Sequence, residues 1–164
     1  MEVGRKNMKK IMSLVVIQQG KKVLLGLKKR GFGVGRWNGF GGKLVQGETV
    51  EESAIRETKE EAGIDLINLK KIGIMDFSYI NGNDDKLEVH LFKSTKFSGK
   101  QTESDEMKPA WFDVNKIPFE KMWPSDKYWY PLFLQNKNFK ANFVFDKPLS
   151  DRIIKYSIQE VNSL

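Results

Sequence analysis

The sequence predicts an α/β fold, in which a β-sheet packs against amphipathic helices. Two short apolar runs at 11–17 and 22–27 flank a glycine-containing break, a pattern typical of a β-hairpin. A capped helical pattern follows at 50–62, and an alternating strand pattern follows at 86–97. A chain of 164 residues is long enough to bury its own core, so we expect one domain over 1–164, with 1–10 as a flexible basic extension.

Composition excludes several classes of protein and site. The chain has no cysteine, which excludes disulfide frameworks, thiolate nucleophiles and cysteine-based metal sites. Its one histidine, His90, lies in an alternating strand pattern, so we expect a strand residue rather than a ligand. No apolar run reaches the roughly 18 residues that span a membrane. We expect a protein without a membrane partner that is cytoplasmic, with nuclear and mitochondrial locations as alternatives.

Charge is segregated along the chain. The net charge is +7, and residues 1–30 hold nine basic residues against one acidic residue. Residues 48–65 reverse this balance, with seven acidic residues against two basic ones. A basic protein favours anionic partners, and its concentrated acidic segment suggests a bound cation. The alternative for the acidic segment is a solvated helix face, which is the usual role of a charge run.

A glycine-rich segment follows the predicted hairpin. Residues 31–42 contain six glycines, which is incompatible with the interior of a helix or strand. We therefore expect a loop whose backbone turns tightly or lies close to another group.

The predicted helix at 50–62 has a defined start and end. Thr49 and Glu52 have the spacing of a capping box, in which Thr49 is the N-cap. Gly63 is the expected C-cap. One face carries three carboxylates at i, i+3 and i+4, which are Glu57, Glu60 and Glu61. We expect the adjoining face to pack on the sheet through Ala54, Ile55, Thr58 and Ala62.

The rest of the chain predicts further strands and a second helix. Strand patterns occur at 64–79, 86–97 and 110–113, with a turn at 81–84. The second helix begins after Trp123, with Ser125 or Asp126 as its cap, and Pro131 must lie in its first turn or kink it. Residues 143–145 and 153–158 are interpreted as two late strands or as a strand and a helix.

The acidic helix and the loop before it form a known pattern. The spacing Gly-x₅-Glu-x₇-Arg-Glu-U-x-Glu-Glu-x-Gly-U, where U is a bulky aliphatic residue, is matched from Gly42 to Ile64 except at one U position, Thr58. The segment resembles the signature of the Nudix hydrolase family, and a pattern with this many constrained positions is a specific signal. Further segments at 28–33, 36–43, 103–107 and 122–129 are similar to Nudix hydrolases that act on oxidised purine nucleoside triphosphates.

The resemblance implies a fold and an activity. It implies an α/β/α sandwich around a central mixed sheet, with a catalytic helix after the glycine-rich loop. It implies dependence on Mg²⁺, with Mn²⁺ as a substitute, and hydrolysis of an 8-oxo-dGTP-type nucleotide to the monophosphate and pyrophosphate. The implied partner is a small-molecule nucleoside triphosphate, and we expect a monomer without a stable nucleic-acid partner.

The resemblance also implies roles for individual residues. The catalytic set is Arg56, Glu57, Glu60 and Glu61, with Glu61 as the base and Arg56 orienting the carboxylates. The implied metal ligands are Gly42, through its carbonyl, together with Glu57, Glu60, Glu61 and Glu106. Asn38 and Asp126 would read the base edge, Trp123 and Phe77 would flank the purine, Phe32 and Met107 would line the pocket, and Ser13 and Lys28 would lie at its rim.

This sequence differs from the family pattern at Ser125. The similar hydrolases usually carry two adjacent acids where this chain has Ser125 and Asp126. Without a charged neighbour, Asp126 is expected to ionise more easily than in the two-acid arrangement, and an ionised Asp126 accepts hydrogen bonds from a guanine-type edge. Oxidised adenine nucleotides would then be disfavoured.

Other interpretations remain open. Another Nudix activity, on a different nucleoside polyphosphate or an RNA 5′ end, is one alternative. A catalytically silent domain that binds nucleotide or RNA is another. For single residues, Trp123 and Phe32 are alternatively core residues, and Asn38 is alternatively a turn residue.

Overall fold

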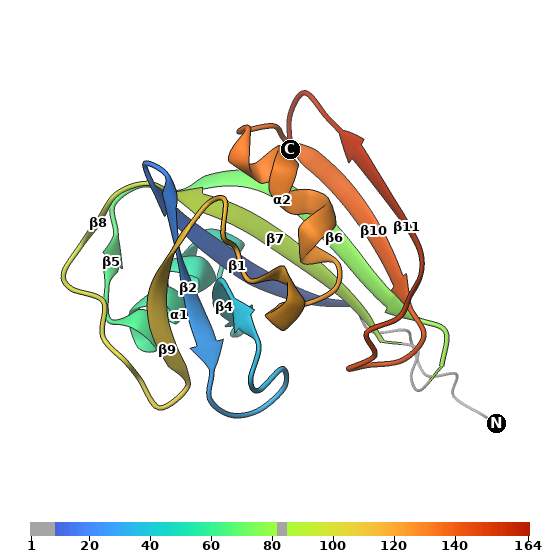
Figure 1. Ribbon diagram of the computed structural model, residues 1–164, viewed down its shortest axis with the longest axis horizontal. Coiled ribbons are helices and arrows are strands. Elements are labelled where there is room, and N and C mark those ends of the chain that lie inside the picture. The colour runs from blue at the N-terminus through green and yellow to red at the C-terminus, as the bar shows by residue number, and fades with distance from the viewer. Residues whose placement is uncertain (1–8, 82–84) are drawn as a thin grey trace.

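The computed structural model describes residues 9–81 and 85–164 (Figure 1). A nine-stranded sheet has the order β11-β10-β6-β7-β1-β2-β3, with β4 paired to β1 and β9 paired to β2, and β5 and β8 form a separate ribbon. The strands are β1 (Lys9–Gln19), β2 (Lys22–Lys28), β3 (Trp37–Asn38), β4 (Phe40–Lys43), β5 (Asp65–Leu66), β6 (Lys70–Tyr79), β7 (Lys86–Ser94), β8 (Phe97–Ser98), β9 (Met107–Asp113), β10 (Phe139–Phe145) and β11 (Ile153–Glu160). The helices are α1 (Val50–Ala62), the 3₁₀ turn η1 (Phe119–Lys121) and α2 (Asp126–Leu134).

The sheet is mixed, and on one side of β1 it divides into two branches, because β1 pairs there with both β4 and β2. Strands β1 and β7 are parallel, as are β6 and β10, whereas β1 and β2 form the predicted antiparallel hairpin. The middle of β1, residues 12–15, pairs with β4, and its last residues, 17–19, pair with β2. This division places the glycine-rich segment directly beside α1 and the centre of the sheet.

Both faces of the sheet are covered, which confirms the α/β/α sandwich (Figure 1). Alternate residues of β1 enter two cores, because side chains of a strand point to opposite faces. Val15 and Ile17 pack with Ala54 and Ala62 of α1, whereas Val16 belongs to the core that contains α2. The buried α2 residues of that core are Trp129, Tyr130 and Phe133.

Helix α1 has the predicted bounds and caps. The Thr49 hydroxyl accepts the Glu52 N–H at 3.1 Å, and Gly63 adopts the left-handed conformation with φ 73°. Thr58 is fully buried and donates its hydroxyl to the Ala54 carbonyl at 2.7 Å, which satisfies the polar atom within the core. The expected burial of Ile55 is wrong, since this side chain is 45% exposed.

Several predicted boundaries need correction. Strand β1 already begins at Lys9 and pairs with Lys86, so only residues 1–8 of the predicted extension lie outside the described part of the chain. The strand predicted at 64–79 is two strands, β5 and β6, and β9 is longer than predicted. Both late segments are strands, β10 and β11. Of the predicted turn at 81–84, residues 82–84 lie outside the described residues.

The second helix also differs from its prediction. Ser125 is the N-cap of α2 but makes no side-chain capping bond. Pro131 is neither in the first turn nor at an end, because it is the sixth residue of the nine-residue helix. Within the described residues, no helix combines the length and apolar character needed to cross a membrane.

Candidate active site

One cavity of about 570 Å³ brings nearly all predicted site residues together. It lies at the division of the sheet, between the glycine-rich segment, α1 and the start of α2. Arg56 is the one predicted residue outside its lining. The predicted residues in its lining are Ser13, Lys28, Phe32, Asn38, Gly42, Glu57, Glu60, Glu61, Phe77, Glu106, Met107, Trp123, Ser125 and Asp126.

The acidic end of the cavity is centred on Glu61, which is only 1% exposed. Its Oε1 accepts the N–H of Gly41 at 2.8 Å. Burial, together with the charges of Glu57 and Glu106, raises the pKa of Glu61 to about 8, against the opposing effects of the Gly41 bond and of Lys28. Glu61 is therefore a buried carboxyl whose charge is poorly compensated by the protein alone.

Arg56 organises the carboxylates from outside the cavity. Its Nε donates to Glu48 Oε1 at 2.7 Å, and its Nη1 donates to Glu57 Oε1 at 3.0 Å and lies 3.3 Å from Glu60 Oε2. The pKa of Glu48 is lowered, chiefly by this bond from Arg56. The pKa of Glu57 is raised instead, because burial outweighs the Arg56 contact. The orienting role predicted for Arg56 thus has a geometric basis.

The acidic side chains at this end supply oxygen ligands, the type of donor that a hard divalent cation prefers. Among residues 9–81 and 85–164, no group of three or more acidic or histidine side chains is already arranged as a metal-binding cluster. Arg56 draws Glu57 and Glu60 toward itself, and Glu61 is turned to Gly41. The donors are nevertheless all oxygens, and a Cβ added to Gly42 would lie 2.8 Å from Glu57 Oε1, so this backbone approaches the carboxylate closely.

The opposite end of the cavity is aromatic. Trp123 is half-buried and stacks on Phe32, with ring centroids 5.2 Å apart and planes 19° apart. Phe32 is 55% exposed, so it does not cap the core. A Cβ added to Gly33 would lie 3.0 Å from the Trp123 ring, which explains a glycine at this position. Phe77 stacks on Phe143, with centroids 5.5 Å apart.

Asp126 and Ser125 are buried beside this aromatic end. Asp126 Oδ1 accepts the Trp129 indole N–H at 3.1 Å, whereas Asp126 Oδ2 and Ser125 Oγ are buried polar atoms without a partner among the described residues. Burial raises the pKa of Asp126 to about 7, against the Trp129 bond and the charge of Arg36. Burial therefore opposes the ionisation that the neutral neighbour favours, because the expectation from the sequence considered the neighbouring side chain and not the loss of solvent.

The remaining predicted residues have diverse surroundings. Ser13 is not at the rim, since it is 2% exposed and its hydroxyl lies 2.9 Å from that of Ser53 on α1. Asn38 Oδ1 accepts the Gly39 N–H at 2.9 Å, so it makes a local turn bond as well as lining the cavity. Met107 is 3% exposed. The strand interpretation of His90 is confirmed, and its Nε2 lies 2.9 Å from Glu88 Oε2.

Comparison with known proteins identifies the family. The sequence matches the NUDIX domain over residues 8–133, which is most of the chain. The chain belongs to the Nudix family. It is 47% identical to the oxidized purine nucleoside triphosphate hydrolase of Mus musculus over 154 residues, covering 94% of this chain and 97% of the relative. The enzyme of the same name from Danio rerio is also 47% identical, with the same coverage.

Solved structures agree on the Nudix fold. A MutT protein from Bacillus halodurans superposes with a TM-score of 0.82 at 23% identity, covering 92% of this chain and 97% of that one. A MutT Nudix hydrolase from Burkholderia pseudomallei has a TM-score of 0.62 at 26% identity, covering 68% and 88%. Nudix hydrolases generally need a divalent metal, in agreement with the oxygen donors at the acidic end.

Sequence reasoning missed several residues that line the Nudix cavity. Arg36, Tyr79, Phe145 and the segment 148–150 also line it. Arg36 lies within the glycine-rich segment 31–42, so its position in the sequence could have indicated that it lines the cavity. The segment 148–150 lies in the connection from β10 to β11 and has no local motif, so its place at the cavity depends on the tertiary fold alone.

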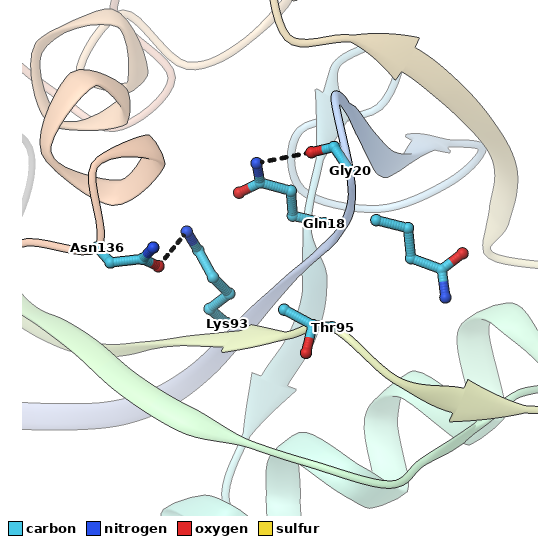
Figure 2. A pocket seen from close by; sticks show the side chains of 6 residues that line it. Gln18, Gly20, Lys93, Thr95 and Asn136 are labelled. Carbon is cyan, nitrogen blue, oxygen red and sulfur yellow. Dashed lines mark hydrogen bonds between the residues drawn. The ribbon is translucent and has the colours of Figure 1, made fainter.

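A second, polar pocket of about 440 Å³ lies outside the Nudix site and contains Lys93 (Figure 2). Lys93 is 6% exposed, and its Nζ donates to the Phe133 carbonyl at 2.6 Å and to Asn136 Oδ1 at 2.7 Å. Burial, together with the charge of Lys70, lowers the pKa of Lys93 to about 8. The two acceptors at the C-terminus of α2 suit a positively charged donor at this position. Lys93 therefore caps this helix from β7.

Replacing Lys93 with methionine is expected to destabilise the protein without affecting catalysis. The substitution leaves the Phe133 carbonyl and Asn136 without a buried donor, which costs about 1–3 kcal/mol in the free energy of unfolding. Urea denaturation measures this change, and turnover at saturating substrate should stay within about twofold of wild type, since the pocket is separate from the Nudix cavity. Unchanged stability would show that Lys93 is not a helix cap.

Proposed function

We propose that this protein hydrolyses oxidised purine nucleoside triphosphates, of the 8-oxo-dGTP type, to the monophosphate and pyrophosphate. The observation that carries the proposal is a single cavity with a carboxylate-rich end around Glu61 and an aromatic end that contains Trp123 and a buried, titratable Asp126. A nucleoside triphosphate has the same division between polyphosphate and base. The identity to the mouse and zebrafish hydrolases supports this assignment.

At the phosphate end, we propose that a divalent cation, Mg²⁺ with Mn²⁺ as a substitute, is held by Glu57, Glu60, Glu61 and Glu106 with the Gly42 carbonyl. Such a cation neutralises the triphosphate and lowers the pKa of bound water. The role of Arg56 is to keep the carboxylates in position through its bonds to Glu48, Glu57 and Glu60. Glu61 would accept the proton of the attacking water in its ionised form, which a bound cation would favour against the effect of burial.

At the nucleobase end, Trp123 supplies a stacking surface and Asp126 reads the base edge. The Trp129 N–H occupies Asp126 Oδ1, so Oδ2 remains for a ligand. Because an indole N–H can only donate, the proton of the neutral carboxyl belongs on Oδ2. Oδ2 therefore donates to a base carbonyl when Asp126 is protonated and accepts from a base N–H when it is ionised. Ser125 Oγ adds a neutral donor or acceptor beside it.

A nucleotide panel tests the proposal directly. The purified protein is incubated with Mg²⁺ and 8-oxo-dGTP, 2-hydroxy-dATP, dGTP, ADP-ribose, a dinucleoside polyphosphate or a capped RNA, and release of pyrophosphate or monophosphate is measured. We expect 8-oxo-dGTP to have the highest kcat/KM and dGTP a much lower one. Preference for another member of the panel would reassign the substrate within the Nudix family. No turnover of any member, with tight nucleotide binding, would indicate a silent binding domain.

Trp123→Ala is expected to weaken substrate binding more than it weakens the fold. Stacking of a base on an aromatic side chain is worth about 1–3 kcal/mol, so KM should rise roughly tenfold or more. Trp123 is half-buried and its ring contacts the exposed Phe32 ring and the Arg36 guanidinium, so the loss of stability should be smaller than that of a core aromatic. Steady-state kinetics and a melting curve separate the two effects. A sharply lower Tm with an unchanged KM would show that Trp123 is a structural residue.

A further inference from the structure

Residues 146–152 connect β10 to β11 (Figure 1). Part of this connection lines the cavity. Pro148, Leu149 and Ser150 line the same cavity as Trp123 and Asp126, although they lie more than twenty residues further along the chain. No mechanism described above uses them. This connection is hereafter called the β10–β11 loop.

The β10–β11 loop is held at its base by hydrogen bonds. The N–H of Asn81 donates to the Asp146 carbonyl at 2.7 Å, and its side-chain amide donates to Asp146 Oδ1 at 2.7 Å. The Asp146 N–H donates to the Arg152 carbonyl at 3.2 Å, and the Arg152 N–H donates to Ser150 Oγ at 3.0 Å. The loop therefore has a defined conformation at the edge of the cavity.

Arg36 connects the tip of the loop to the aromatic end of the cavity. Its Nη2 donates to Asp151 Oδ1 at 2.7 Å, and its Nη1 donates to the Met122 carbonyl at 3.0 Å. The same guanidinium lies 4.5 Å from the centroid of the Trp123 ring. Arg36 thus contacts the loop, the segment before α2 and the Trp123 ring. Its side chain is only 22% exposed.

Leu149 is held in an unfavourable conformation at this edge. Its φ is 65°, in the left-handed region that leucine adopts only at an energetic cost. Its side chain is 55% exposed although it is large and apolar. Backbone strain of this kind persists where surrounding contacts enforce it and is enriched at ligand-binding positions. The Ser150 N–H donates to the Lys147 carbonyl at 3.1 Å, which closes a tight turn with Leu149 at its third position, and the contacts of Asp146, Arg152 and the Arg36–Asp151 pair flank this turn.

We infer that the β10–β11 loop is a substrate-binding wall, in which Leu149 covers the nucleobase and Arg36 is the positioning residue that holds the loop against Trp123. This inference rests on the proposed function, since it assumes a nucleotide whose base lies at the aromatic end. Loss of the wall should weaken nucleotide binding, whereas the acidic end should keep its chemistry. The expected signature is a rise in KM and in the Kd for the product monophosphate at constant kcat.

Substitutions of Leu149 test the apolar cover. Leu149→Gly removes the apolar side chain and the left-handed strain together, so KM and the Kd for 8-oxo-dGMP should rise about 5- to 20-fold with a Tm equal to or above that of wild type. Leu149→Asn is the matched variant, because asparagine tolerates the same conformation without the flexibility of glycine. Both variants should show the same binding loss. A lower Tm with unchanged KM and Kd would assign Leu149 a purely structural role and overturn the inference.

Substitutions of Arg36 and Asp151 test the positioning role of Arg36. Asp151→Asn should raise KM about 2- to 5-fold, as an exposed ion pair contributes little. Arg36→Met also removes the contact with Trp123 and should raise KM about 10-fold or more. The double variant should be no weaker than Arg36→Met, because Asp151 acts through Arg36. Asp65→Asn, which breaks the exposed Lys59–Asp65 pair away from the cavity, is the control and should leave KM unchanged.

The outcomes separate this inference from the proposed function. If wild type neither hydrolyses 8-oxo-dGTP nor binds 8-oxo-dGMP, the proposed function fails, and the variants are then measured with the best nucleotide of the panel. If wild type binds its nucleotide and the Leu149 and Asp151 variants bind it equally well, the loop is not a binding wall. Additive effects of Arg36→Met and Asp151→Asn would contradict the positioning role.

Discussion

Glu61→Gln is expected to lower kcat for oxidised purine triphosphates by about 10²- to 10⁴-fold, the usual contribution of a general base. The glutamine keeps an oxygen for the Gly41 N–H, so the local geometry is preserved. It removes a buried charge that lies close to those of Glu57 and Glu106. The free energy of unfolding without metal should therefore be unchanged or higher. Steady-state kinetics with Mg²⁺ and urea denaturation in EDTA measure the two quantities.

The matched control for this prediction is Glu51→Gln. Glu51 is an exposed acid in the first turn of α1, and its loss changes the same charge without affecting the cavity. Its turnover should stay within about twofold of wild type. EDTA should abolish wild-type turnover, and Mg²⁺ or Mn²⁺ should restore it. Near wild-type turnover by Glu61→Gln, or activity that persists in EDTA, would require the metal-hydrolase assignment to be abandoned.

Asp126→Asn is expected to lower kcat/KM for 8-oxo-dGTP by about 10- to 100-fold, because the base-reading atom changes from a titratable oxygen to a permanent N–H donor. The loss should be greater at pH 8 than at pH 6. With a pKa raised to about 7, wild-type Asp126 is mostly ionised at pH 8 and accepts N–H donors of a guanine-type edge. At pH 6 it is mostly protonated and resembles the amide. The measurement is a pH series of kcat/KM for both proteins.

The same substitution has a consequence for stability. A carboxyl whose pKa is higher in the folded than in the unfolded state stabilises the fold while it is protonated, and that stability is lost as pH rises. For Asp126 the loss should occur between about pH 4, near the unfolded pKa, and pH 7. Asp126→Asn should remove this dependence, so its Tm should exceed that of wild type more at pH 8 than at pH 5. A Tm difference that is constant with pH would show that Asp126 does not titrate in this range.

The titration also alters the expected selectivity. Preference for 8-oxo-dGTP over 2-hydroxy-dATP should be greatest above pH 7, where Asp126 only accepts, and should diminish below it. The side chain at 125 supplies no charge that would shift this midpoint further, since Ser125 is neutral. Equal use of the two nucleotides at every pH would show that the protonation of Asp126 does not set selectivity.

The acidic end of the site could be predicted residue by residue because its geometry is local. Glu57, Glu60 and Glu61 lie within one helix turn or so, and the helical repeat alone places them on one face. The caps of α1 depend on neighbouring residues, so Thr49 and Gly63 were also correctly predicted. Even here burial was harder to predict, since Ile55 is exposed and Ser13 is buried.

By itself, the sequence determined the helix that carries the carboxylates, the hairpin, and the family to which its spacing belongs. Only the tertiary structure decided how distant segments meet: Arg36 reaches the Met122 carbonyl across 86 positions of the chain and Asp151 across 115. It also decided the protonation of Asp126, because desolvation depends on every residue packed around a group. Periodicity and motifs report contacts within a few residues. Burial and contacts between distant residues arise only when the strands take their order in the sheet.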